Sequence, residues 1–297
     1  MRVLLLVLAL VLTGCADGGP RRPEVVVTTN ILGDVTRMIA GDEAEVTVLM
    51  RPGADPHSFG VSARQAAALE RAALIVYNGL GLEEGVLRHV GAAREAGVPA
   101  LAVAEAADPL RYPGGQADPH FWTDPRRMLK AVDAISAAVQ RVPGADPAAV
   151  RANAAAYRRE VERLDAWMER SLAAIPPHRR DLVTDHHVFG YFADRYGFRV
   201  VGAVIPGGTT LASPSAADLE QLAGTIREHD VPAIFAGSSQ PDRLARVLAE
   251  EAGVRVRVVH LFTESLTAPG KGADTYLTLM RANTGAIVDA LTERNAS

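Results

Sequence analysis

The chain has 297 residues, a hydrophobic fraction of 48% and a formal net charge of −4. The length allows one large domain or two ordinary ones, because single hydrophobic cores stop growing at about 250 residues. The negative charge excludes the basic electrostatic field that nucleic-acid-binding proteins use. We therefore expect a folded protein of one or two domains with no nucleic-acid partner.

The N-terminal segment MRVLLLVLALVLTGC is typical of a secretory signal. Arg2 precedes an apolar run over residues 3–12, which is far shorter than the ~20 residues of a membrane-spanning helix. Cys15, the sole cysteine, lies where bacterial lipoproteins carry the residue that is diacylated after cleavage. A plain signal peptide that contains a cysteine by chance is the alternative. We predict a signal peptide over 1–14, a lipidated tether over 15–23, and anchoring through Cys15 to the extracytoplasmic face of the cell membrane.

From residue 24 onward, short β-branched runs alternate with segments of helical periodicity. Four runs in the first half of the chain predict strands, namely EVVVTT, AEVTVLM, ALIVYNG and VPALAVA, and the second half repeats the pattern with RDLVTDH, FRVVGAV, VPAIFAG and VRVRVVH. The helical segments between them are 31–40, 63–72, 82–96, 188–196, 215–229, 242–252 and 274–292. Such alternation is typical of a parallel sheet covered on both faces. We predict an α/β protein with an N-terminal lobe over 24–145 and a C-terminal lobe over 177–297.

The segment between the lobes, residues 146–176, predicts one long helix. Its apolar residues recur at three- and four-residue spacing and form one stripe, which consists of Val150, Ala154, Tyr157, Val161, Leu164, Met168 and Ile175. Asp146-Pro147 is a helix start signal, and Pro176-Pro177 is a stop signal. At ~1.5 Å per residue the helix would be ~40 Å long, enough to run along both lobes as a rigid spine. An ordinary core helix is the alternative.

Two histidines follow Asp-Pro pairs, His57 in GADPHSFG and His120 in ADPHFW. His57 comes just after a predicted strand, and His120 lies in a loop that ends before a helix beginning at Asp124-Pro125. Loops that leave the carboxyl ends of parallel strands gather at one sheet edge, where ligands usually bind. A lone loop histidine is more often structural than functional. The pair, each held behind a proline that restricts the backbone, predicts a ligand site.

The second half of the chain offers two adjacent histidines and one less obvious acid. His186 and His187 end a strand, and because neighbouring strand residues point to opposite faces, at most one of them faces a cleft. Asp274 follows a glycine-rich loop at the start of the last predicted helix, where spacing alone favours a helix N-cap. The residues by themselves therefore leave open which histidine and which carboxylate belong to the site.

Five segments resemble, in chain order, the zinc and manganese solute-binding proteins of ABC importers, the ZnuA/TroA family. These are TTNILGDVTRMIAGDEAEVTVLMRPGADPHSFGVSARQ, AALIVYNGLGLE, DPHFWTDP, HHVFGYFADRYGF and DTYLTLMRAN. The likeness runs from about residue 25 to the C-terminus. Two further segments, PSAADLEQL and IFAGSSQPDRLARVLAEEAG, resemble the zinc-binding AztC branch in particular. The resemblance implies two lobes joined by a spine helix, metal in the cleft between them, an ABC permease as partner, and no enzymatic activity.

The same resemblance implies a ligand set of His57, His120, His186 and Asp274. This chain departs from the family motif H-D-A-F-G-Y-F at His187, where Asp is usual, so the choice of His186 rests on alignment to FGYF. Three imidazoles and one carboxylate suit Zn(II). Manganese members generally have a carboxylate at the third position, which makes a harder site. We predict Zn(II) as cargo with Mn(II) as the alternative, a monomeric carrier, and a metallochaperone as a further candidate partner.

A zinc-dependent hydrolase is the alternative from another class, because three histidines and an acid also describe many catalytic zinc sites. Catalysis needs an open coordination position and a nearby general base. The chain has neither an HExxH motif nor a spare glutamate within the ligand motifs. We therefore predict a binding protein. An adhesin lipoprotein is a third possibility, but adhesion would not explain four ligands.

Overall fold

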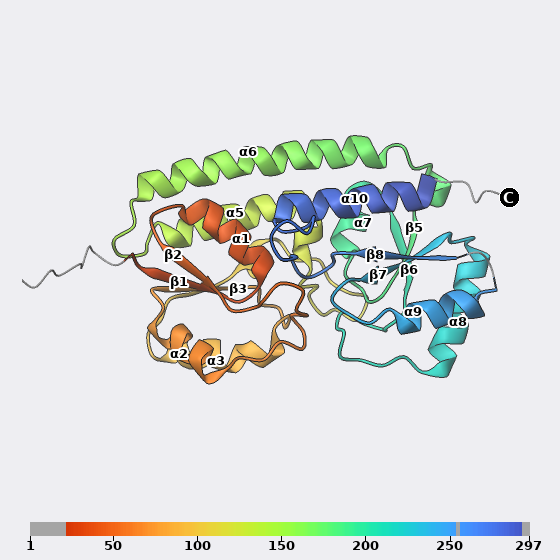
Figure 1. Ribbon diagram of the computed structural model, residues 1–297, viewed down its shortest axis with the longest axis horizontal. Helices are drawn as coiled ribbons and strands as arrows, with labels where there is room; N and C mark the ends of the chain where they lie inside the picture. The colour runs from red at the N-terminus through yellow and green to blue at the C-terminus, as the bar shows by residue number, and fades with distance from the viewer. Residues whose placement is uncertain (1–21, 254–255, 293–297) are drawn as a thin grey trace, which may run out of the picture.

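The computed structural model describes residues 22–253 and 256–292. Two four-stranded parallel sheets lie side by side, each flanked by helices, and one long helix runs above both (Figure 1). The predicted α/β architecture with two lobes is therefore confirmed. The predicted signal peptide and Cys15 lie outside the described residues. Among the residues described, no helix combines the length and apolar character needed to cross a membrane.

The N-terminal lobe contains the sheet of order β2-β1-β3-β4, in which all neighbouring strands are parallel. Its strands are β1 (Glu24–Val27), β2 (Glu45–Val48), β3 (Leu74–Tyr77) and β4 (Ala100–Ala102). Its helices are α1 (Asn30–Ala40), α2 (Ala63–Arg71), α3 (Glu84–Glu95), α4 (Val103–Ala106), the 3₁₀ turn η1 (Phe121–Thr123) and α5 (Pro125–Val139). Side chains alternate across β1, so that Val25 and Val27 join the core under α1 and α5 whereas Val26 joins the core under α2 and α3.

The C-terminal lobe repeats this design with a sheet of order β6-β5-β7-β8. Its strands are β5 (Asp181–Thr184), β6 (Arg199–Ala203), β7 (Ala233–Gly237) and β8 (Arg257–Leu261), and its helices are η2 (Pro177–Arg179), α7 (Gly190–Tyr196), α8 (Ala216–Glu228), α9 (Arg243–Glu251) and α10 (Tyr276–Thr292). Leu182 and Val183 on β5 enter separate cores on the two faces of the sheet. Both faces are covered, as the continuous apolar strands predict.

The long helix between the lobes is α6 (Pro147–Leu172), and its predicted apolar stripe is buried. The Asp146 carboxylate accepts a hydrogen bond from the Ala148 amide at its start. The helix ends four residues before the predicted boundary, because the backbone ahead of Pro176 cannot continue the α conformation. One face of α6 packs against α1 and α5 of the first lobe and α10 of the second, which joins the two lobes along their length (Figure 1). The division of the chain into domains at 146 and 176 stays a prediction.

Candidate metal centre

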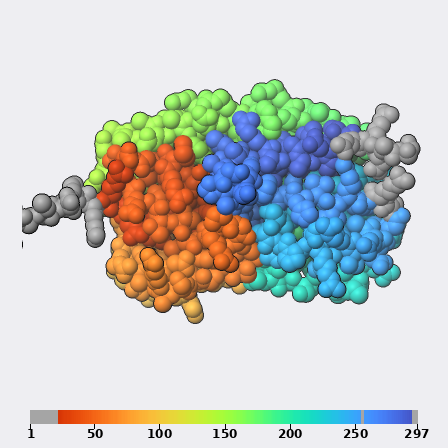
Figure 2. All heavy atoms as spheres, in the orientation of Figure 1, coloured from red at the N-terminus to blue at the C-terminus, as the bar shows by residue number. Residues whose placement is uncertain are grey.

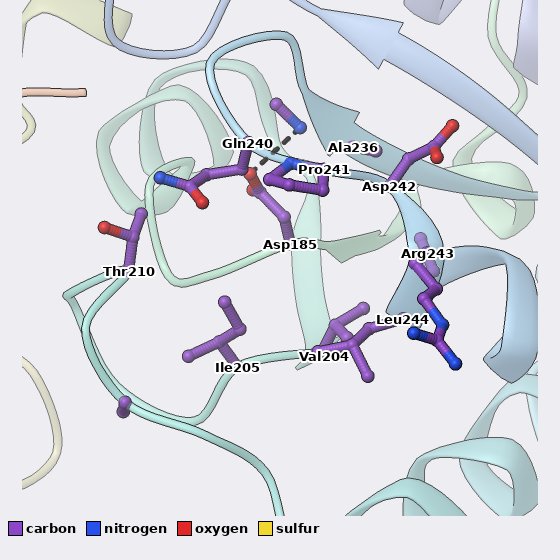
Figure 3. Close-up of a pocket in the computed structure, with 13 residues that line it drawn as sticks. Asp185, Val204, Ile205, Thr210, Ala236, Gln240, Pro241, Asp242, Arg243 and Leu244 are labelled. Carbon is purple, nitrogen blue, oxygen red and sulfur yellow. Dashed lines mark hydrogen bonds between the residues drawn. The ribbon is translucent and has the colours of Figure 1, made fainter. Parts of the chain in front are cut away.

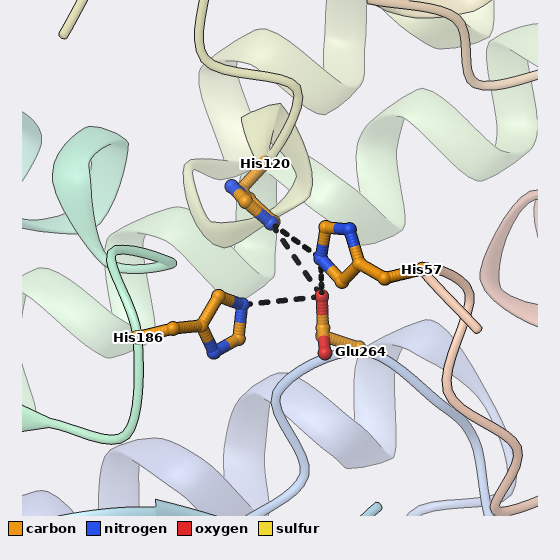
Figure 4. A group of neighbouring side chains, drawn as sticks. All are labelled: His57, His120, His186 and Glu264. Carbon is orange, nitrogen blue, oxygen red and sulfur yellow. Dashed lines mark hydrogen bonds and ion pairs between the residues drawn. The ribbon is translucent and has the colours of Figure 1, made fainter. Parts of the chain in front are cut away.

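Four buried side chains from separate loops meet between the two lobes (Figure 4). They are His57, His120, His186 and Glu264, none is more than 3% exposed, and their potential ligand atoms lie within 4.8 Å of one another. The Nε2 atoms of His57, His186 and His120 lie 2.8, 3.3 and 3.5 Å from Glu264 Oε1. Three imidazole nitrogens therefore surround one carboxylate oxygen. The structure thus brings together the three predicted histidines.

His57 is held by the loop that follows β2. The Asp55 carboxylate accepts a hydrogen bond from the His57 amide at 3.0 Å, which closes a tight turn around the proline between them. Gly53 opens this loop with φ of 74°, a left-handed conformation that glycine adopts without strain. The Asp-Pro pair therefore fixes the direction in which the imidazole leaves the backbone.

His120 is oriented by a second carboxylate two residues earlier. Asp118 Oδ1 accepts a hydrogen bond from the His120 amide at 2.9 Å and lies 2.8 Å from His120 Nδ1. The Tyr112 hydroxyl donates to the same oxygen at 3.0 Å, so Asp118 itself is held in place. A carboxylate on one ring nitrogen fixes the tautomer that leaves the other nitrogen free for a metal. The second Asp-Pro-His motif thus forms the same turn as the first, and its aspartate also contacts the histidine ring.

His186 follows β5 and is supported by the residue before it. Asp185 Oδ1 accepts a hydrogen bond from the His186 amide at 2.9 Å and lies 3.2 Å from His186 Nδ1. Asp185 Oδ2 accepts a hydrogen bond from the Gly237 amide at 2.9 Å. A β-carbon at Gly237 would lie 2.4 Å from that oxygen, so only glycine allows this approach.

The neighbouring histidine, His187, is not a member of the group. Its amide donates to the Gly207 carbonyl at 3.0 Å, and its ring centroid lies 6.4 Å from that of Tyr112. β5 ends at Thr184, before both histidines, so the backbone of the loop and not the alternation of a strand directs the two rings apart. The structure thus places His186, and not His187, with the other two histidines.

The fourth member differs from the predicted one. Asp274 does not join the group; its carboxylate accepts hydrogen bonds from the Gly270 amide at 2.8 Å and the Thr278 hydroxyl at 3.3 Å. It closes the loop before α10, and the N-cap role that its spacing favoured belongs to the next residue: Thr275 Oγ1 accepts a hydrogen bond from the Thr278 amide at 3.1 Å. The carboxylate beside the histidines is Glu264, which lies three residues beyond β8. Its position after a strand end was a signal available in the sequence, and we replace Asp274 by Glu264 as the proposed ligand.

The electrostatics of the group favour a bound cation. Burial opposes ionisation of Glu264, but the His186 charge and hydrogen bonds from the histidines outweigh it and hold the pKa of Glu264 well below its usual range. Burial also opposes a charge on His186, but Glu264 and Asp185 raise the pKa of His186 well above its ordinary value. Both Glu264 oxygens and both His186 ring nitrogens lack a well-aligned hydrogen bond within the described part of the chain. A divalent cation would satisfy Glu264 and His186 Nε2, whereas His186 Nδ1 faces Asp185 at 3.2 Å.

The two lobes also meet directly beside the group. Asp55 Oδ2 accepts hydrogen bonds from Thr210 Oγ1 at 2.7 Å and Gln240 Nε2 at 2.6 Å, both from the C-terminal lobe. A surface pocket of about 250 Å³ opens next to this contact and is lined by Thr210, Gln240, Asp185 and apolar side chains that include Leu244 (Figure 3). None of the four clustered residues lines the pocket. Access to the group therefore requires movement of the covering side chains or of the lobes.

Comparison of the chain with known protein families agrees with this geometry. The family model described as "Zinc-uptake complex component A periplasmic" matches residues 25–290. The chain belongs to this family. Its members are the metal-binding components of ABC metal importers, which work outside the cytoplasm with a permease and an ATPase. The chain is therefore a metal-binding protein and not an enzyme.

Relatives in this family carry different metals. The zinc-binding protein TroA of Treponema pallidum is 32% identical over 283 residues, which cover 93% of this chain and 90% of TroA. The manganese-binding lipoprotein MntA of Bacillus subtilis is 31% identical over 296 residues, which cover 94% of this chain and 95% of MntA. The solved structure of T. pallidum TroA has a TM-score of 0.86 at 31% identity, covering 92% of this chain and 100% of that chain. The finer likeness to the AztC branch stays a prediction.

Alanine substitutions distinguish the two candidate acids. We expect Glu264→Ala to weaken zinc binding by about 100-fold or more, because loss of one ligand costs a substantial part of the ~10–16 kcal/mol of a four-ligand zinc site. Asp274→Ala is the matched control and should keep wild-type affinity, since its carboxylate accepts hydrogen bonds from Gly270 and Thr278 and is not among the clustered side chains. Competition titration against a chelator measures both. If Asp274→Ala weakened zinc binding and Glu264→Ala did not, Asp274 would be the fourth ligand, as the family resemblance implied.

Metal affinity should depend steeply on pH. Imidazole binds metal only when it is neutral. Burial opposes a charge on either ring, but Asp118 and Glu264 raise the pKa of His120. Glu264 and Asp185 likewise raise the pKa of His186. Protons therefore compete with zinc for these imidazoles at pH values above the ordinary histidine pKa of ~6.5 as well as below it. We expect zinc affinity to fall as the pH is lowered from above 7 to about 5, with protons released on binding already at pH 7. Calorimetry in buffers of different ionisation enthalpy measures this release, and pH-independent binding would contradict it.

Proposed function

We propose that this protein captures Zn(II) outside the cytoplasm and delivers it to the permease of an ABC importer. The observation that carries the proposal is the donor set of one buried group, three imidazole nitrogens and one carboxylate. Four-coordinate nitrogen and oxygen sites suit Zn(II), which has no geometric preference of its own from d-electrons. Zinc-binding TroA supports this choice, whereas manganese-binding MntA is nearly as similar to the chain.

The proportion of nitrogen to oxygen is the reason to favour zinc over manganese. Manganese prefers carboxylate, carbonyl and water oxygens, and the group offers a single carboxylate, Glu264. The supporting carboxylates, Asp118 and Asp185, lie against ring nitrogens of His120 and His186 and so strengthen these histidines as ligands. Affinity alone would still favour Cu(II) over Zn(II), so selection between these two metals depends on geometry and availability.

The metal and the transport role can be tested together in cells that lack the native gene. We expect the wild-type protein and Asp274→Ala to restore growth under zinc chelation, and Glu264→Ala to fail, because only the last loses the metal. The measurements are growth rate and cellular zinc content. Restoration by added manganese instead of zinc would identify manganese as the cargo, and normal growth of the deletion strain under chelation would exclude uptake as the main task.

We also propose that Cys15 carries a lipid anchor. Its supporting observation is the apolar run and small residues before Cys15 in the sequence. We further propose that the carrier is a monomer, since one chain supplies all four proposed ligands, and that a metallochaperone outside the cytoplasm is a partner that loads it.

Replacement of the cysteine should separate anchoring from metal binding. We expect Cys15→Ala either to leave an unprocessed precursor or to release the protein from the membrane fraction, because acyl chains contribute ~0.8 kcal/mol per buried methylene. Zinc affinity should stay at the wild-type value, since all four proposed ligands lie well beyond the tether. Fractionation and immunoblotting measure the first effect. Membrane retention of a processed Cys15→Ala protein would contradict lipidation.

A further inference from the structure

Glu264 lies on a segment that belongs to the C-terminal lobe by sequence and contacts the N-terminal lobe in space. The segment runs from the end of β8 to the start of α10 and lies against the first lobe (Figure 2). On the C-terminal side, Asn283 of α10 holds the Phe262 backbone through hydrogen bonds of 2.8 and 2.9 Å. Beyond Phe262, the hydrogen bonds that hold the residues flanking Glu264 come from the first lobe.

One amide of the first lobe holds the two residues that follow Glu264. Asn30, the first residue of α1, is 6% exposed. Its Nδ2 donates to Ser265 Oγ at 2.8 Å, and its Oδ1 accepts a hydrogen bond from the Leu266 amide at 2.9 Å. Nδ2 also donates to the Arg51 carbonyl at 3.2 Å, which ties this contact to the loop that carries His57.

Further donors of the first lobe complete this attachment. Trp122 Nε1 donates to the Thr263 carbonyl at 2.8 Å, and the Gly53 amide donates to the Leu266 carbonyl at 3.0 Å. Trp122 is two residues from His120, and Gly53 opens the loop of His57. Glu264 is therefore flanked on both sides by hydrogen bonds to the segments that hold those two histidines.

The Glu264 carboxylate contacts the three histidines, but neither of its oxygens has a well-aligned hydrogen-bond partner within the described residues. The backbone that carries the carboxylate is held by Asn30, Trp122 and Gly53. These contacts therefore determine how far the carboxylate reaches toward the histidines. Removal of the Asn30 amide would leave Ser265 Oγ and the Leu266 amide buried without that partner and would free the segment to move.

We infer that Asn30 is a positioning residue for Glu264, an assignment that rests on the proposed metal-binding function. Through this attachment Glu264 is held by the N-terminal lobe, which then carries three of the four proposed ligands, His57, His120 and Glu264. His186, supported by Asp185 of the same strand end, is then the single ligand carried by the C-terminal lobe. Separation of the lobes at the Asp55 contact would detach His186 and leave a three-ligand half-site.

A double-mutant cycle on the full-length protein tests the assignment. We expect Asn30→Ala to weaken Zn(II) binding by about 10–100-fold, the usual range for residues that orient metal ligands. In a Glu264→Ala background, Asn30→Ala should change affinity less than about twofold, because the group it positions is gone. Equal losses in both backgrounds would overturn the assignment. Absence of zinc binding by the wild-type protein would instead refute the proposed function.

Controls separate positioning from general stability. Asn153→Ala removes an amide of α6 that donates to the Ile39 carbonyl of α1 at 3.3 Å, away from the metal centre, and should keep wild-type affinity. Ser265→Ala removes one Asn30 contact and spares the Leu266 bond, so its loss should be smaller than that of Asn30→Ala. Co(II) bound at saturation should show the same change in visible absorption in Asn30→Ala as in Glu264→Ala. A wild-type Co(II) spectrum in Asn30→Ala would also overturn the assignment.

Discussion

The rest of the site depends on one buried charge, the Glu264 carboxylate. A carboxylate removed from water is costly unless it is paired, and hydrogen bonding normally supplies part of the compensation. Here both oxygens lack well-aligned hydrogen bonds to any residue that the structure describes, and they face three imidazoles. The group can be satisfied by protons on the histidines or by a metal cation, and these compete for the same nitrogens. This competition couples metal binding to proton release.

The fold brings this charge and its partners together without a continuous motif. In each parallel sheet the carboxyl ends of the strands point to one edge, and in this protein the loops after β2, β5 and β8 supply His57, His186 and Glu264. His120 comes from the loop before α5, where Asp118 orients it. Because α6 packs against helices of both lobes, the two sheet edges stay facing each other. The fold therefore provides the approximate placement, and carboxylates and amides provide the final orientation.

The arrangement suits reversible capture of a metal ion. A site with all its ligands on one rigid body would bind well but release slowly, whereas ligands divided between two bodies can be separated by a small movement. The Asp55 carboxylate joins the lobes through Thr210 and Gln240 beside the group, and Asp55 also fixes the turn that carries His57. The Asp55 side chain therefore takes part both in the contact between the lobes and in the placement of His57.

Local sequence patterns predicted the strands, the long helix and the first two histidines, and the family resemblance supplied the third. β-branched runs and a three-four apolar stripe are local patterns, and they predicted both sheets and α6 up to the last turn before Pro176. His57 and His120 have distinctive Asp-Pro contexts, and alignment to FGYF selected His186 over His187. These features depend on neighbours within a few residues, which is why sequence patterns report them.

The fourth member of the group follows from tertiary packing. Asp274 had the expected motif, but it contacts its own loop, ten residues along the chain from the acid that reaches the histidines. Glu264 is brought there by Trp122 and Asn30, whose partners in the segment lie 141 and 235 residues away in sequence. No local propensity encodes which side chain such distant hydrogen bonds will hold. The carboxylate was therefore selected by the packing of one lobe against the other.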